Sequence, residues 1–117
     1  MERLNAALID VPDVKVRVVE RCTSTNSALL EDKSAGRILL AAEEQTAGRG
    51  RHGRRWESAA GADVTFSLSS PVQRPARELA SLSLVAAVAA VKALRALGVG
   101  AASVKWPNDL LAGVFPR

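Results

Sequence analysis

The sequence predicts an α/β fold of the α+β type, with a mixed β-sheet flanked by helices. Three observations support this class. Short segments alternate apolar and polar residues with the period of a strand, two segments have helical character, and they follow in the order strand, helix, strand, strand, helix, strand. The chain has 117 residues, and 48% of them are hydrophobic. This length and composition are typical of one globular domain or part of one.

The first half of the chain contains two predicted strands and one predicted helix. Residues 15–20 alternate polar and apolar side chains, as a half-buried strand does, and residues 37–42 are apolar enough for a more buried strand. Between them, residues 23–26 are Thr, Ser, Thr and Asn, the residue types that cap helix N-termini. We therefore expect a helix over 27–33 that ends at Gly36.

The second half contains two further strands and a long helix. Residues 64–69 alternate again and predict a strand, and residues 103–106 predict a short one. Between them we expect a helix over 78–97, ended by Gly98 and Gly100. Apolar residues at helical spacing predict a stripe on this helix that packs in the core. The stripe consists of Leu79, Leu82, Ala86, Ala89, Ala90, Ala93 and Leu97.

The composition excludes several classes of protein. Cys22 is the single cysteine, which excludes a disulfide framework and a thiolate metal site, and the single histidine excludes a multi-histidine zinc site. The first twelve residues lack a signal pattern, and the longest apolar stretch, residues 84–91, is too short and too alanine-rich for a bilayer. We expect a soluble, cytoplasmic protein without a membrane partner.

Positive charge is concentrated in one loop, residues 48–56, which contains four arginines and three glycines and ends in a tryptophan. Glycine lets the backbone approach a ligand closely, and the arginine guanidinium fits carboxylate and phosphate oxygens. The loop therefore predicts a clamp for a nucleotide phosphate or an acyl phosphate. A solvated basic turn and a nucleic-acid contact remain alternatives, although few aromatic residues accompany the charge.

Residues 48–53 also match the glycine pattern of dinucleotide-binding folds. That pattern should open a helix, but residues 54–63 are polar and interrupted by glycine. Position 68, where an acidic residue would hold the ribose, is leucine. A P-loop is excluded because no Gly-Lys-Ser/Thr follows.

Three other segments carry candidate site residues. Ser24-Thr25-Asn26 is either a plain helix cap or a cap whose polar groups face a ring in a pocket. Gln45 directly precedes the arginine loop and by itself favours a surface glutamine. In residues 105–109, Trp-Pro fixes an extended strand end, after which Asn-Asp forms either an Asx turn or a site for Mg²⁺ beside phosphates. We expect no chemical role for Cys22.

Together these segments resemble the biotin protein ligase (biotin–acetyl-CoA-carboxylase ligase) family. The resemblance covers about residues 18–111, and both the arginine loop and the Lys-Trp-Pro-Asn-Asp segment match in order and spacing. It implies a catalytic domain similar to class II aminoacyl-tRNA synthetases. The matching segments are residues 24–26, 45–56, 66–68, 79–97 and 105–110.

The resemblance also implies a reaction. Biotin and ATP give biotinyl-5′-adenylate, and biotin then passes to a lysine of a biotin carboxyl carrier domain of acetyl-CoA carboxylase or a related carboxylase. ATP acts as co-substrate with Mg²⁺, and no bound prosthetic group is implied. The expected partners are this carrier domain and a second copy of the chain in a homodimer, whereas DNA is not expected.

Residue roles follow from the same resemblance. The polar triplet would line the ureido pocket, and the first two loop arginines would be catalytic, holding the carboxylate and the phosphates. The implied biotin site is Ser24, Thr25, Asn26, Gln45, Arg49, Gly50 and Arg51. The implied nucleotide site is Arg49, Arg51, Arg54, Trp56 and Asn108. Asp109 would bind Mg²⁺.

The sequence departs from the family after Asp109. The family continues with a segment whose lysine is needed for activity, but no lysine follows Lys105 here. We expect residues 1–117 to be a partial, truncated catalytic domain, weakly active or inactive, without a DNA-binding domain and with exposed strand edges and apolar helix surface. A non-catalytic biotin or nucleotide binder and a basic nucleic-acid-binding domain are the alternative functions.

Overall fold

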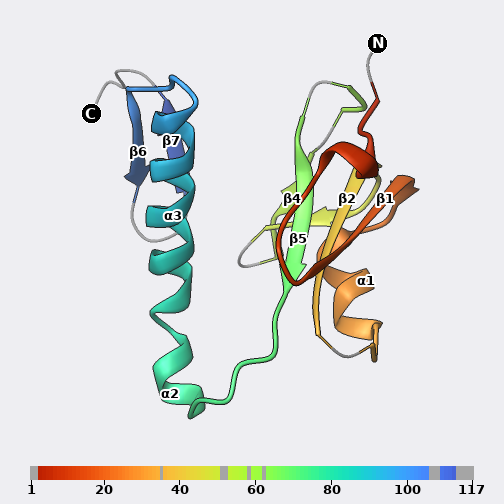
Figure 1. The fold of residues 1–117 in the computed structure, drawn as a ribbon, viewed down its shortest axis with the longest axis horizontal. Helices are drawn as coiled ribbons and strands as arrows, with labels where there is room; N and C mark the ends of the chain where they lie inside the picture. The colour runs from red at the N-terminus through yellow and green to blue at the C-terminus, as the bar shows by residue number, and fades with distance from the viewer. Residues whose placement is uncertain are drawn as a thin grey trace. The chain divides into compact units, whose positions relative to one another are not determined.

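A computed structural model describes residues 3–34, 36–50, 53–57, 59–61, 63–105 and 109–112. The chain divides into two compact units, Met1–Val72 and Gln73–Arg117 (Figure 1). Each unit contains both strands and helices, so the expected α/β class is confirmed.

The first unit is built on a three-stranded mixed sheet with the strand order β1-β2-β5. Strand β1 (Val14–Cys22) runs parallel to β2 (Arg37–Gln45), and β5 (Thr65–Ser69) pairs antiparallel with the other edge of β2. Helix α1 (Thr25–Glu31) connects β1 to β2, and a short 3₁₀ helix, η1 (Ala6–Leu8), precedes β1. The predicted mixed sheet and its strand–helix–strand crossover are confirmed.

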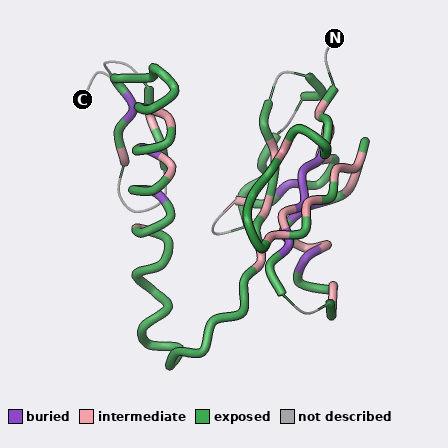
Figure 2. The backbone as a smooth tube through the Cα atoms, in the orientation of Figure 1, coloured by how far each residue is buried: buried purple, intermediate pink, exposed green. Residues whose placement is uncertain are grey.

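The core of this unit lies between α1 and the central strand. Strand β2 is buried on both faces, which explains its continuous apolar sequence. Leu29 of α1 packs against Ile38 and Leu40 of β2, with Val19 and Ala28 at the border of the cluster. Figure 2 shows the buried residues of this unit gathered on β2 and α1. This packing holds α1 against the sheet.

Strand β5 has an unusual pattern of side chains. Phe66 and Leu68 are each 55% exposed, whereas Thr65, Ser67 and Ser69 are half-buried. Ser67 lies opposite Leu40 in the register, and opposite residues share a face of the sheet, so its hydroxyl lies on the α1 side. The usual arrangement of apolar residues inside and polar residues outside is therefore reversed on β5.

The second unit contains α2 (Ala76–Leu79), α3 (Leu82–Ala96), β6 (Ala102–Lys105) and β7 (Asp109–Ala112), with β6 and β7 antiparallel. The single helix expected over 78–97 is wrong at its start, because a turn at residues 80–81 separates α2 from α3. The Ser81 hydroxyl donates to the Glu78 carbonyl at 3.2 Å in this turn. The local bond competes with the helical hydrogen-bonding pattern.

The predicted end of the long helix is confirmed. Gly98 has φ +100°, its N–H donates to the Arg95 carbonyl at 3.1 Å, and the Val99 N–H donates to the Leu94 carbonyl at 2.9 Å. These two bonds form a Schellman motif, which requires a residue that tolerates positive φ. The Arg95 guanidinium then donates to the Ala102 carbonyl and ties the end of α3 to β6.

The predicted apolar stripe, which begins on α2 and continues along α3, is wrong as a core-packing face. The buried residues are Ala87 and Val91, and of the predicted stripe only Ala90 is half-buried while the others are exposed. Helix α3 is apolar on most sides, so the spacing of its apolar residues does not identify the buried face. Packing against β6 and β7 determines which face is covered. The exposed apolar surface expected from the sequence is present on Val85 and Val88 of α3, as it is on β5.

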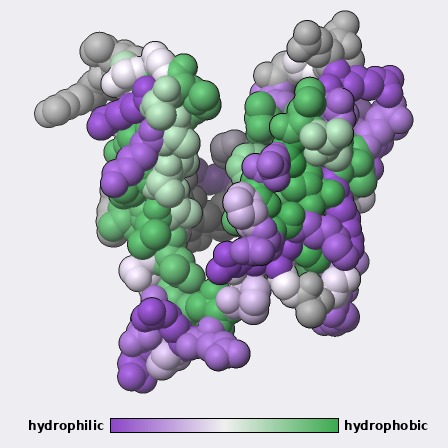
Figure 3. Space-filling model, in the orientation of Figure 1, coloured by the Kyte–Doolittle hydropathy of each residue, from purple (hydrophilic) through white to green (hydrophobic). Residues whose placement is uncertain are grey.

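Within the described residues, one helical stretch, Ala76–Ala96, is long and apolar enough to cross a membrane by length and composition. This differs from the expectation drawn from residues 84–91. Figure 3 shows the apolar side chains that gather along this helix. A single stretch of this kind is weak evidence for a membrane span, because core helices of soluble proteins have the same length and composition.

Candidate functional site

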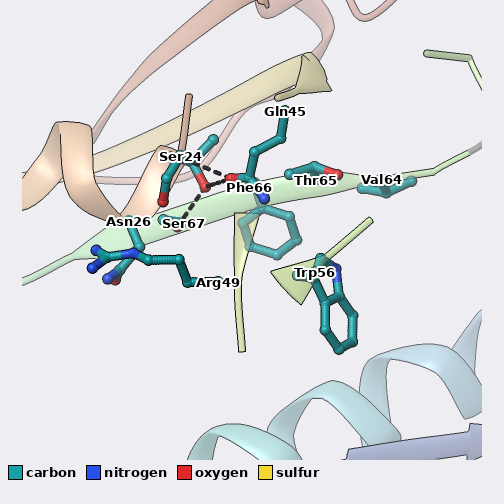
Figure 4. A pocket seen from close by; sticks show the side chains of 10 residues that line it. Ser24, Asn26, Gln45, Arg49, Trp56, Val64, Thr65, Phe66 and Ser67 are labelled. Carbon is teal, nitrogen blue, oxygen red and sulfur yellow. Dashed lines mark hydrogen bonds between the residues drawn. The ribbon is translucent and has the colours of Figure 1, made fainter. Parts of the chain in front are cut away.

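A pocket of about 250 Å³ opens in the first unit where four elements meet: the start of α1, the end of β2, the hairpin of β3 (Gly48–Arg49) and β4 (Arg55–Trp56), and β5. Most of the side chains around it are polar, with apolar groups from the hairpin and β5 (Figure 4). The residues lining it are Ser24, Thr25, Asn26, Gln45, Arg49, Trp56, Val64, Thr65, Phe66 and Ser67.

The parallel pairing of β1 and β2 brings α1 and Gln45 together. Pairing continues past the strand ends, because the Thr46 N–H donates to the Cys22 carbonyl at 2.9 Å and the Ala47 N–H donates to the Thr23 carbonyl at 2.7 Å. Ser24, the residue after Thr23, is the N-cap of α1, so the first turn of the helix lies next to the end of β2.

Ser24 is the N-cap of α1, and its hydroxyl accepts from the Ser27 N–H at 3.2 Å. The cap interpretation of this residue is therefore confirmed. Ser24 and Thr25 are both buried, and with Asn26 they also line the pocket. The triplet therefore combines both predicted roles, since Ser24 caps the helix and all three residues line the pocket.

Three side chains form a hydrogen-bonded network in the pocket wall. The carboxamide Oε1 of Gln45 accepts from the Thr25 backbone N–H at 2.8 Å and from the Thr25 hydroxyl at 3.3 Å. The Thr25 and Ser67 hydroxyls are 2.7 Å apart. Thr25 is only 2% exposed, so these bonds satisfy polar groups that water does not reach. The interpretation of Gln45 as a surface glutamine is wrong, since the residue is half-buried and its carbonyl is fixed.

Sequence reasoning did not identify Ser67 as a site residue. A signal was present in the alternation of residues 64–69, where hydroxyl residues occupy one face and Phe66 and Leu68 the other. The face of a strand that packs against a helix is normally apolar, so a row of hydroxyls there indicates a polar cavity.

The arginine loop is partly a hairpin. Strand β3 (Gly48–Arg49) pairs antiparallel with β4 (Arg55–Trp56), whereas the sequence predicted loop throughout. The Gly50 N–H donates to the Arg54 carbonyl at 2.6 Å and closes the turn. Gly53 has φ +73°, a conformation that favours glycine. Two residues of the loop, Arg51 and His52, lie outside the described residues.

Arg49 and Arg55 lie opposite each other in this hairpin. Like charges directly opposite destabilise an antiparallel pair, and an anion between them offsets the repulsion. The Arg49 guanidinium donates to the Ser27 hydroxyl at 2.5 Å and lies beside Asn26 at the pocket (Figure 4). Among the described residues, no ion pair involves Arg49, Arg54 or Arg55. The hairpin therefore presents positive charge that the described residues leave uncompensated.

Comparison with known proteins identifies the family. A model of the biotin/lipoate A/B protein ligase family matches residues 18–114. The chain belongs to this family. It is 41% identical to the biotin–acetyl-CoA-carboxylase ligase of Mycobacterium tuberculosis over 103 residues, which cover 81% of this chain and 39% of that protein. It is 39% identical to the bifunctional ligase/repressor BirA of Escherichia coli over 109 residues, covering 86% of this chain and 34% of that protein.

The fold agrees with the same family. The structure matches the biotin protein ligase of Aquifex aeolicus in complex with biotin and ATP with a TM-score of 0.68 at 32% identity. The match covers 82% of this chain and 40% of the other. This biotin/lipoate ligase family chain therefore has the catalytic-domain fold of biotin protein ligases, and it spans less than half the length of the relatives described above.

The other predicted residues of this biotin/lipoate ligase family chain are placed as follows. Trp56 lines the pocket and is 59% exposed, whereas Gly50 and Arg54 do not line it. Asp109 begins β7 in the second unit, opposite Lys105. Asn108 lies outside the described residues. Across the described ranges, no group of three or more His, Cys, Asp or Glu side chains is arranged to hold a metal ion.

Proposed function

We propose that the chain carries the biotin-binding part of an ATP-dependent biotin ligase. In this reaction biotin and ATP form biotinyl-5′-adenylate, and biotin then passes to a lysine of a carboxylase carrier domain. The observation that carries the proposal is the fixed Thr25–Gln45–Ser67 network in the wall of a small pocket beside the Arg49 guanidinium. The family match and the names of the relatives support it.

The pocket suits the chemistry of biotin. The ureido group presents one carbonyl acceptor and two N–H donors, and Ser24, Thr25 and Asn26 offer both hydroxyl and amide groups. Val64, Phe66 and Trp56 supply apolar surface for the sulfur ring and the alkyl chain. Pockets for drug-sized ligands measure roughly 300–1,000 Å³. The cavity of about 250 Å³ favours a smaller molecule of this kind.

The arginine loop would serve the reacting groups. The biotin carboxylate must approach the α-phosphate of ATP although both are negatively charged. Arg49 and Arg51 would neutralise that charge and stabilise the transition state, while Gln45 and Gly50 would contact the carboxylate end of biotin. Arg54 would add a phosphate contact.

Further nucleotide and metal contacts are proposed from the family resemblance. The Trp56 indole would pack near the adenine, and Asn108 would contact the nucleotide. Mg²⁺ is held by one or two carboxylates together with substrate phosphates and water, so the single carboxylate of Asp109 is sufficient for it. Magnesium would neutralise phosphate charge, and no prosthetic group is needed.

The acceptor of biotin is proposed from the names of the relatives. The name biotin–acetyl-CoA-carboxylase ligase supports a biotin carboxyl carrier domain as the acceptor. We propose the cytoplasm as its location and a homodimer as a further assembly.

A second candidate is biotin or nucleotide binding without turnover. The observation that favours it is that all described pocket residues come from the first unit, so binding does not need Asp109. Biotin affinity without adenylate formation distinguishes this function from the first.

The proposal is tested by incubating the 117-residue chain with biotin, ATP and Mg²⁺ and measuring biotinyl-5′-adenylate by mass spectrometry. A full-length relative serves as the positive control, and an Arg49→Ala variant as the negative control. Adenylate from the wild-type chain alone supports ligation. Biotin binding without adenylate supports the second candidate, and neither binding nor adenylate contradicts both.

A further inference from the structure

Gly48 is buried in β3 at a point where a side chain has no room. A Cβ atom there would clash with Nε2 of Gln45, would lie 2.7 Å from the carbonyl oxygen of Trp56 and 3.2 Å from the Trp56 Cβ. Real Cβ atoms essentially never come within 3.0 Å of another heavy atom, so two neighbours would have to move. By contrast, a Cβ on Gly100 would meet nothing within 4 Å.

The two groups that a Cβ on Gly48 would meet most closely differ in how easily they can move. The Trp56 carbonyl belongs to the backbone of the paired strand, whereas the Gln45 carboxamide ends a flexible side chain. The carboxamide would therefore give way first. Its present position depends on Thr25, which holds Oε1 through a backbone N–H and a hydroxyl. Displacing the amide costs these bonds.

The Gln45 carboxamide is thus held by Thr25 at its oxygen, and its nitrogen fits where it does because Gly48 has no side chain. With the oxygen occupied, the NH₂ group is the part of the amide left to meet a ligand. Gln45 is among the residues that line the pocket (Figure 4).

We propose that Gly48 is a positioning residue whose missing side chain leaves room for the Gln45 carboxamide to present its NH₂ group as a hydrogen-bond donor to the ligand. The inference rests on the proposed biotin site and deepens it. The ligand must place an acceptor oxygen, a carbonyl or a carboxylate, opposite Nε2. Gly48 itself touches no ligand and acts through Gln45.

The first test compares biotin binding of Gly48→Ala and Gly100→Ala, two identical changes of which one has free space. Loss of one hydrogen bond predicts that Gly48→Ala weakens binding roughly tenfold, while Gly100→Ala leaves it unchanged. In a Gln45→Ala background, Gly48→Ala should cost less than it does in the wild type, because the amide it displaces is gone and only the contact with the Trp56 carbonyl remains. Unchanged binding in Gly48→Ala, or full additivity of the two substitutions, overturns the proposal.

A second variant keeps the test decisive if Gly48→Ala does not fold. Gln45→Glu retains size and the oxygen that accepts from Thr25 but replaces the NH₂ donor with an oxygen. Biotin binding should fall at least about tenfold in this variant. Binding equal to that of the wild type shows that the NH₂ group is not the donor.

Nuclear magnetic resonance separates this inference from the proposed function. The chain has two glutamines, Gln45 and Gln73, so two side-chain NH₂ pairs of this type are expected. Gly48→Ala should shift the Gln45 pair and leave the Gln73 pair unchanged, and Gly100→Ala should shift neither. If the wild type does not bind biotin, the proposed function fails while this shift still supports positioning by Gly48. An unshifted Gln45 pair refutes that positioning whatever the binding result.

Discussion

The backbone N–H of Thr25 donates to the carboxamide oxygen of Gln45 at 2.8 Å, across 20 residues of sequence. This bond connects the first turn of α1 to the end of β2. It satisfies a backbone donor that the first helical turn leaves without a partner, and it orients a side chain in the pocket. One interaction thus stabilises the fold and shapes the candidate site.

Replacement of Thr25 by valine should lower both stability and binding. Valine keeps the shape and the backbone N–H but removes the hydroxyl, leaving Ser67 without this partner. A lost buried hydrogen-bond partner costs about 1–3 kcal/mol. Urea unfolding should show this decrease, and calorimetry should show weaker biotin binding. The control is Thr46→Val, whose hydroxyl is exposed and makes a bond of 3.4 Å. Equal losses in both variants are incompatible with a specific role of the network.

Pyrophosphate should stabilise the chain through the arginine hairpin. An anion near Arg49 and Arg55 relieves the repulsion of two guanidinium groups in register. We expect the unfolding temperature to rise with pyrophosphate more than with sodium chloride of equal ionic strength. Arg49→Ala should remove most of the difference, and Arg77→Ala, on the exposed helix α2, should not. A rise that is equal in all three proteins places the anion elsewhere.

Stability should fall at low pH through Asp32. Hydrogen bonds from Ser34, followed by Arg17, lower the pKa of this carboxyl from 3.8 to about 2. Because the folded-state pKa is the lower one, the stabilisation is present above about pH 4 and is lost as the pH falls toward 2. Urea unfolding between pH 2 and 5 should show this loss in the wild type and not in Asp32→Ala. Arg17→Gln should retain part of it, since the Ser34 bonds remain. An identical pH dependence in the wild type and in Asp32→Ala contradicts this account.

The Cys22 thiol should react slowly. Partial burial raises the pKa of this thiol, so less thiolate is present at a given pH. At pH 8.5, iodoacetamide should modify the folded chain more slowly than free cysteine, and urea should remove the difference. Equal rates for the folded chain and free cysteine rule out this effect of burial.

Much of the fold followed from local patterns. The alternation in residues 15–20, the cap residues at 23–26 and the buried segment 37–42 predicted β1, α1 and β2, because each pattern reflects an environment set along one element. Gly98 predicted the helix end for the same reason, since a Schellman motif needs only neighbouring residues. The boundaries of these elements differed from the prediction by at most three residues.

The failures concern contacts between distant elements. The buried face of α3 depends on β6 and β7, and an almost wholly apolar helix gives no preference of its own. The fixed Gln45 depends on α1 lying beside the end of β2, and the role of Ser67 depends on its register with Leu40. The steric requirement at Gly48 likewise arises from Trp56 on the paired strand. None of these contacts between distant residues produces a periodic pattern in the local sequence.

Direct binding of biotin tests the central claim of this account. Equilibrium dialysis of labelled biotin against the folded 117-residue chain should give saturable binding at one site. Binding should be weakened in Thr25→Val and Arg49→Ala and retained in Thr46→Val. Absence of saturable binding to the folded wild-type chain, or equal binding in all four proteins, would contradict the assignment of this pocket to biotin.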